Sequence, residues 1–140
     1  MKPEGEPSAL PKGYRFAGTA CRLKARGLDL GVIVSDVPAR AAAVFTRNEV
    51  QAAPVLLCRD FLRRSGGNVR AILVNSGNAN CCTGPAGLEG ARESARRLAR
   101  LLGAHPHQIL VASTGVIGVP LPFSKIWNHL EDLTSGLSNS

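Results

Sequence analysis

Short apolar segments separated by polar turns dominate the first two-thirds of the chain. Most are five to seven residues long and are rich in Val, Ile, Leu and Ala, which is typical of strands. Pro54 stands at the first position of one such segment, where a strand tolerates a missing N–H. The pattern predicts five strands, at residues 28–34, 41–46, 54–58, 69–75 and 108–112.

A longer period appears in residues 88–102, where apolar residues recur at steps of three and four with Arg and Glu opposite them. Gly103 follows as a C-terminal stop, so this segment is predicted to be a helix. Shorter helices are predicted at residues 60–64 and, with Ser124 as N-cap, at residues 124–133. Strands mixed with helices indicate an α/β (mixed α+β) fold class.

The composition is that of a globular protein. Of the 140 residues, 44% are hydrophobic and 19% are charged, which excludes a disordered or collagen-like chain and allows one domain or part of one. We divide the chain into an irregular lead-in at 1–12, a domain at 13–133 and an unpatterned tail at 134–140. No apolar run reaches the roughly 18–20 residues of a membrane helix, and no signal-peptide core is evident, so we expect a cytoplasmic protein.

The formal net charge of +7 suggests a nucleic acid or an anionic substrate. The basic residues are scattered, however, and in the predicted helix Arg92, Arg96 and Arg97 alternate with Glu89 and Glu93. That alternation favours an ordinary solvated surface over a nucleic-acid interface.

No metal site is expected from the cysteines and histidines. The four cysteines are interpreted as reduced thiols, and the adjacent pair does not match the CxxC spacing of a zinc site. None of the three histidines stands at ligand spacing from a cysteine. The cysteines are Cys21, Cys58, Cys81 and Cys82.

Three polar stretches next to predicted strands are candidates for chemistry. In the first, Arg47 could hold a carboxylate through a bidentate pair, or it could be a surface residue in a solvated turn. The second directly follows the most apolar strand and is rich in Asn and Gly, which can aim amide groups at a ligand or merely satisfy the loop's own backbone. Its candidate residues are Asn75, Ser76, Gly77, Asn78 and Asn80.

The third stretch contains Ser113, Thr114 and Gly115. A hydroxyl beside a glycine offers one O–H and one N–H donor side by side, which an oxyanion hole requires. A glycine-assisted turn after a strand is the alternative reading.

Together these stretches resemble the ornithine acetyltransferase family, also known as the arginine biosynthesis bifunctional protein or glutamate N-acetyltransferase. The resemblance extends from about Gly13 to about Leu133. Its motifs are Phe45-Thr46-Arg47-Asn48 with Ala52-Ala53-Pro54, Asn75-Ser76-Gly77-Asn78-Ala79-Asn80 with Cys82-Thr83-Gly84, and Ser113-Thr114-Gly115-Val116-Ile117-Gly118 with Leu121-Pro122.

The resemblance implies the N-terminal part of a layered fold of the ornithine acetyltransferase or DmpA-like type. It implies transfer of an acetyl group from N-acetylornithine to glutamate, with acetyl-CoA as a second donor in some members and no other cofactor. Thr114 and Gly115 correspond to the family's oxyanion hole.

The resemblance also implies autocatalytic cleavage of a precursor before a Thr, which becomes the nucleophile of a β chain and carries the acetyl group. Two α and two β chains then form a heterotetramer. The cleavage sequence has no match in these residues, so the chain is expected to be inactive alone and to leave apolar strand faces uncovered. The alternatives are a truncated inactive homologue and a small basic nucleic-acid-binding module.

Overall fold

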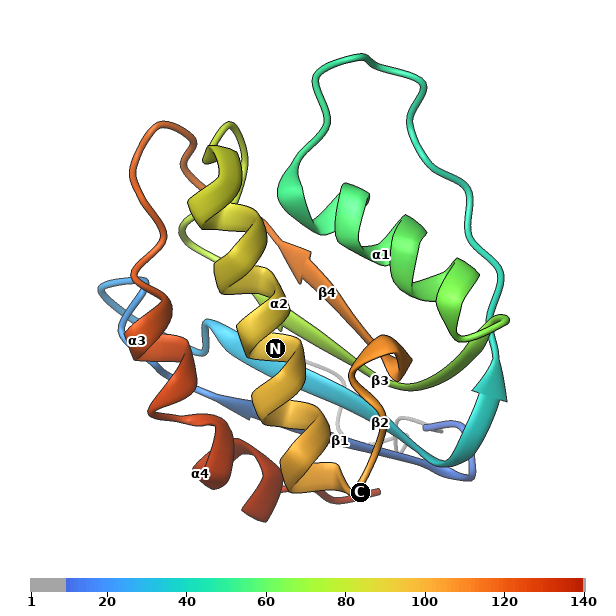
Figure 1. Ribbon diagram of the computed structural model, residues 1–140. Coiled ribbons are helices and arrows are strands. Elements are labelled where there is room, and N and C mark those ends of the chain that lie inside the picture. Colours follow the sequence, from blue (N-terminus) through green and yellow to red (C-terminus); the bar gives the residue numbers. More distant parts are fainter. Residues whose placement is uncertain (1–9, 140) are drawn as a thin grey trace, which may run out of the picture.

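The computed structural model describes residues 10–139, and its strands form one mixed sheet in the order β1-β2-β3-β4 (Figure 1). The first three strands pair antiparallel, and β3 and β4 pair parallel. The strands are β1 (Tyr14–Thr19), β2 (Leu30–Arg40), β3 (Asn68–Asn75) and β4 (Ile109–Ser113). The helices are α1 (Ala53–Arg64), α2 (Gly84–Leu102), the 3-10 helix η1 (Pro106–Gln108), α3 (Phe123–Trp127) and α4 (Leu130–Ser135).

The parallel pair β3–β4 determines where the candidate loops lie. Two parallel strands cannot be joined by a tight turn, and α2 crosses the sheet face to connect them. The register pairs Asn75 with Ser113, the last residue of each strand. The loops that follow these two residues therefore leave the sheet side by side at the same edge.

The hydrophobic core lies between one face of the sheet and the helices. Figure 1 shows α1 and α2 crossing this face, with α3 and α4 beside α2. Burial alternates along β3, as expected when alternate side chains point to opposite faces. The fully buried side chains at the centre of this layer include Val34, Leu57, Leu98, Ile109, Leu130 and Leu133.

The opposite face of the sheet carries an apolar row. Phe16, Ile33 and Ile72 are register partners across β1, β2 and β3, so their side chains share one face. Each is only half-buried, unlike the neighbouring buried residues Val32 and Leu73, which face the helices. No helix among residues 10–139 packs over this row, which we call the open face.

The α/β class and several elements are as the sequence predicted. Strand β3 and helix α2 are confirmed, with α2 beginning four residues before the predicted Leu88. Gly103 ends α2 in the left-handed conformation, with φ of 61°. The predicted strands at 28–34 and 108–112 overlap β2 and β4, with different ends.

Two predicted strands are wrong. Residues 54–58 lie in helix α1, and the predicted helix 60–64 is the end of this same helix. The spacing of the buried side chains is helical and not alternating; these are Pro54, Leu57, Cys58 and Phe61. Residues 41–46 form no strand; they continue beyond the end of β2 as an open loop, in which Val44 is fully exposed.

The remaining differences lie at the two ends of the domain. Strand β1 was not predicted, and the helix expected at 124–133 is two helices separated at Asn128 and His129. In the tail, Ser138 pairs with Phe16 on the outer edge of β1 through N···O distances of 2.7 and 3.0 Å.

Candidate functional site

The loops that follow β3 and β4 are joined by backbone hydrogen bonds. Ala79 N–H donates to the Val116 carbonyl at 2.9 Å, and Val116 N–H donates to the Gly77 carbonyl at 3.2 Å. These bonds make an isolated parallel bridge between Asn78 and Val116. The structure therefore brings two of the three predicted polar stretches together.

Three buried asparagines, one at the end of β3 and two in the loop that follows it, form hydrogen bonds with backbone atoms. The Asn75 amide donates to the Asn78 carbonyl at 2.8 Å, and the Asn78 amide donates to the Pro120 carbonyl at 3.3 Å. The Asn80 amide donates to the Gly87 carbonyl in α2 at 2.9 Å, while its backbone N–H donates to Ser113 Oγ at 2.9 Å. These side chains hold the two loops and α2 in one arrangement.

Thr114 and Gly115 are exposed at the start of the second loop. Thr114 N–H donates to the Asn75 carbonyl at 3.0 Å, and its hydroxyl lies 3.4 Å from the same oxygen, longer than a strong O–H···O bond. The Gly115 N–H has no hydrogen-bond acceptor within the described residues. One hydroxyl donor and one backbone donor thus stand next to each other at the sheet edge.

Gly115 is required by the close approach of the two loops. Its φ is 129°, a conformation that L-residues rarely adopt. A Cβ at this position would overlap the carbonyl carbon of Gly77 and lie 2.5 Å from the backbone nitrogen of Asn78. Gly77 has φ of 100°, and a Cβ there would lie 2.5 Å from Lys24 Cγ. Both glycines allow backbone to pack where a side chain would not fit.

Asp29 connects residues 21–24 to the start of the first loop, and its role was not predicted from the sequence. Its buried carboxylate accepts backbone N–H bonds from Cys21 at 2.6 Å, Leu23 at 2.7 Å and Lys24 at 2.8 Å. Its own carbonyl accepts from Ser76 N–H at 2.9 Å. A lone acidic residue inside the apolar run 28–34 was the available sequence signal.

Burial disfavours the charged form of Asp29, but the N–H bonds from Lys24, Cys21 and Leu23 outweigh it and hold the pKa of this carboxyl below its usual range. The pKa of Cys21 is shifted in the opposite direction. Burial, together with its hydrogen bond to Asp29, raises the pKa of the Cys21 thiol to about 11. Cys21 is therefore an unreactive thiol beside an ionised carboxylate.

Arg47 is separate from this arrangement. It is exposed in the loop between β2 and α1, which arches away from the sheet in Figure 1. The hydrogen bonds of this loop connect Thr46, Asn48 and Gln51 with one another and with Arg59 of α1. Within the described residues Arg47 has no hydrogen bond or ion pair, so the structure does not bring it to the other candidates.

A pocket of about 370 Å³ opens beside the paired loops. It lies between the start of α2 and residues 118–121 of the second loop, and apolar groups dominate its lining. Val119 in this wall is exposed, and so are Val116 and Ile117, which precede the wall in the sequence. The site therefore combines polar backbone donors with apolar surroundings, as small-molecule sites commonly do.

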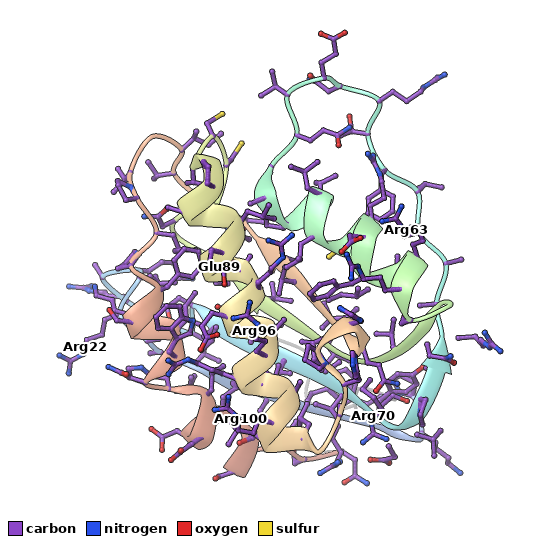
Figure 2. All side chains as sticks on the ribbon, viewed as in Figure 1. Arg22, Arg63, Arg70, Glu89, Arg96 and Arg100 are labelled. Atoms are coloured by element: carbon purple, nitrogen blue, oxygen red, sulfur yellow. The ribbon has the colours of Figure 1, made fainter. Side chains whose placement is uncertain are left out.

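The basic residues of α2 are largely paired with acids. Figure 2 shows Glu89, Arg96 and Arg100 along this helix. Arg96 forms ion pairs of 2.9 Å with Glu89 and 2.8 Å with Glu93, and Arg97 pairs with Glu93 at 2.8 Å. The alternating charges predicted an ordinary solvated surface, and the structure shows that this surface is ion-paired.

No set of three or more His, Cys, Asp or Glu side chains in residues 10–139 is grouped to hold a metal ion. None of the helices in this range combines the length and apolar character needed to cross a membrane.

Fold and candidate site together define an α/β protein in which two hydrogen-bonded loops follow a pair of parallel strands and one of them exposes the Thr114 hydroxyl and the Gly115 N–H. Comparison with known proteins identifies its relatives. A family model described as the ArgJ family matches residues 15–140. The arginine biosynthesis bifunctional protein ArgJ of Geobacter sulfurreducens is 51% identical over 130 residues, covering 92% of this chain and 33% of the relative. The protein of that name from Thermotoga neapolitana is 46% identical over 129 residues, covering 92% and 32%.

Solved structures agree with these matches. ArgJ from Bacillus halodurans superimposes with a TM-score of 0.81 at 41% identity, covering 85% of this chain and 62% of that one. Ornithine acetyltransferase from Mycobacterium tuberculosis, solved in complex with ornithine, superimposes with a TM-score of 0.86 at 36% identity, covering 96% and 74%. The chain belongs to the ArgJ family, and it spans about a third of the length of the curated relatives it matches.

Proposed function

We propose that this chain supplies the oxyanion hole and part of the scaffold of an acetyltransferase of arginine biosynthesis. The enzyme moves an acetyl group from N-acetylornithine to glutamate, and acetyl-CoA can serve as a second donor. The observation that carries the proposal is the exposed pair of donors at the end of β4, the Thr114 hydroxyl and the Gly115 N–H. Relatives named for arginine biosynthesis, and one solved with ornithine bound, support the substrate class.

The donors suit the charge that acyl transfer creates. When a nucleophile attacks an acetyl carbonyl, its oxygen becomes an oxyanion in the tetrahedral intermediate, and fixed donors stabilise it. The Gly115 N–H is fixed by the close packing of its backbone against Gly77 and Asn78. The Thr114 hydroxyl has only a 3.4 Å contact with the Asn75 carbonyl, so turning it toward an oxyanion sacrifices little.

The nucleophile in this proposal is a Thr from sequence outside residues 1–140. After self-cleavage of a precursor it heads a β chain, where its free amine acts as base and its hydroxyl carries the acetyl group. Two α and two β chains assemble in the cytoplasm. The open face around Phe16, Ile33 and Ile72 supports assembly with further protein, because an apolar row of this kind is favourably buried.

The test uses the complete enzyme that contains this chain. Thr114→Ala removes one donor and is expected to slow acetyl transfer from N-acetylornithine to glutamate by roughly 10²–10³-fold, the usual effect of losing an oxyanion-hole donor. Thr114→Ser retains the hydroxyl and should retain most of the activity. Thr134→Ala is the control, because its hydroxyl bonds the Glu131 carbonyl in α4. Unchanged turnover in Thr114→Ala would refute the oxyanion assignment.

A further inference from the structure

Two adjacent thiols lie in the loop between β3 and α2, outside the donor pair just described. The Sγ atoms of Cys81 and Cys82 are 3.8 Å apart, Cys81 is partly exposed, and Cys82 is exposed. The other two cysteines are buried, and Cys58 Sγ donates to the Val111 carbonyl at 3.2 Å. Cys81 and Cys82 are therefore the thiols that solution species can reach.

Their separation fits chelation better than disulfide formation. In a tetrahedral zinc site the Zn–S distance is about 2.3 Å, which places two thiolate sulfurs about 3.8 Å apart. A disulfide needs sulfurs about 2.05 Å apart and Cα atoms usually about 4.4–6.8 Å apart. Adjacent Cα atoms are only about 3.8 Å apart, so a bond between these neighbours would be strained. The observed 3.8 Å separation already matches one edge of a thiolate tetrahedron.

The backbone beside the two thiols leads into the start of α2. Cys82 has φ of 56° and precedes α2 by two residues, and the N-cap residue Thr83 makes no side-chain capping bond. The unpaired N–H groups at a helix start favour nearby negative charge.

The pocket of about 370 Å³ borders both cysteines. Its other lining residues are Thr83, Ala86, Gly87, residues 118–121 and Phe123, among which no His, Asp or Glu occurs. An ion held by the two sulfurs would therefore keep its other coordination positions open toward the pocket, for water or a small external ligand.

We propose that Cys81 and Cys82 form a bidentate site for a thiophilic divalent ion of the Zn²⁺ or Cd²⁺ type. Binding forms two metal–sulfur bonds and releases the two thiol protons to solvent, with no change of oxidation state. This two-ligand site differs from a closed structural zinc site, which takes four protein ligands. It departs from the sequence-based expectation of no metal site, which rested on the absence of CxxC spacing and of histidines at ligand spacing from a cysteine.

The test titrates the reduced protein with Zn²⁺ in competition with a chromophoric chelator. We expect one ion per chain and protection of Cys81 and Cys82 from iodoacetamide, read by mass spectrometry. Cys81→Ser or Cys82→Ser should each weaken binding by about 10²-fold or more, since the second ligand no longer acts intramolecularly. Cys58→Ser changes the thiol count equally and should leave affinity unchanged.

Three results would overturn the proposal. The first is equal Zn²⁺ affinity in the Cys81→Ser/Cys82→Ser double variant. The second is loss of binding in His105→Ala with the cysteines intact, which would assign the ion to the neighbouring rings of His105 and His107. The third is formation of a Cys81–Cys82 disulfide by glutathione disulfide with no measurable Zn²⁺ binding by the reduced protein.

Discussion

Thr114 donates its backbone N–H to the carbonyl oxygen of Asn75, 39 residues earlier in the chain, at 3.0 Å. This bond continues the parallel pairing of β3 and β4 one step beyond the strands. It makes the position of the candidate donor depend on the asparagine loop. The site is therefore one structure built from two loops, and changes in either loop should affect the other.

Asn75→Asp tests the buried amide that shapes the first loop. The substitution replaces an N–H donor with an oxygen facing the Asn78 carbonyl at about the present 2.8 Å. We expect a loss of about 1–3 kcal/mol in the free energy of unfolding, the usual effect of an unsatisfied buried polar group. Urea unfolding measures it. Asn139→Asp, at an exposed position, should change little, and equal losses in the two variants would contradict the assignment.

Gly115→Ala tests the contact between the two loops, with Gly118→Ala as its matched control. Both glycines have positive φ, 129° and 91°, so both variants carry backbone strain. Only a Cβ at 115 overlaps other backbone, because nothing lies within 4 Å of one at 118. We expect Gly115→Ala to lose about 1–3 kcal/mol more stability in urea unfolding than Gly118→Ala. Equal stability in the two variants would show that the two loops can move apart without a loss in the free energy of unfolding.

Asp29→Asn tests the buried carboxylate that binds the backbone of residues 21–24. It removes a charged acceptor from three N–H groups, and we expect a loss of about 3 kcal/mol at neutral pH. Asp132→Asn, at an exposed position in α4, is the control. If Asp29→Asn lost less stability than Asp132→Asn, then water or another group would accept the three N–H bonds in place of the carboxylate.

The pH dependence of stability gives a second measure of Asp29. Its pKa is lower in the folded protein than in the unfolded chain, so the unfolded state binds more protons in acid. Its stabilising contribution is complete above about pH 5, and it decreases as the pH falls below about 4 toward the folded-state pKa. Urea unfolding at several pH values should show a smaller acid loss in Asp29→Asn than in the unsubstituted protein.

Ile72→Glu tests the open face. Ile72 pairs in register with Ile33, which pairs with Phe16, so Ile72 stands at one end of this apolar row. We expect the 140-residue chain to self-associate through the row. Light scattering should detect the association, and Ile72→Glu should reduce it. Val50→Glu adds the same charge at an exposed loop position and should leave the association unchanged. A monomeric unsubstituted chain would show that the row does not cause association.

The elements predicted best from sequence are those whose burial pattern is uniform along their length. In β3 every second residue is buried, and α2 buries Ala91, Ala95 and Leu98 on one helical stripe. Helix α1 was misread because 54–58 is a continuous apolar run, and the helical spacing becomes visible only when Phe61 is included. In strand β1 the alternation covers only Tyr14, Arg15 and Phe16 before Ala17 and Gly18 follow, so the local pattern is too short to predict a strand.

The candidate site was predictable in its composition but not in its geometry. The sequence identified both loops, yet the bond between Thr114 and Asn75 depends on the parallel pairing of strands that local patterns do not specify. Arg47 seemed comparable because it also follows an apolar segment, but that segment, 41–46, is not a strand and carries it away from the sheet edge. The role of Asp29 depends on the folding of residues 21–24 around it, which no local pattern shows.

The hydrogen bonding of the second loop separates the residues that maintain its shape from those that face outward. Val116 is held through its backbone N–H and carbonyl, while its side chain, like those of Ile117 and Val119, is more than half exposed. Substitutions at these three positions can therefore alter the surface offered to a ligand while the backbone frame persists. Under the proposed function, relatives can differ in substrate preference at these positions while keeping the same fold.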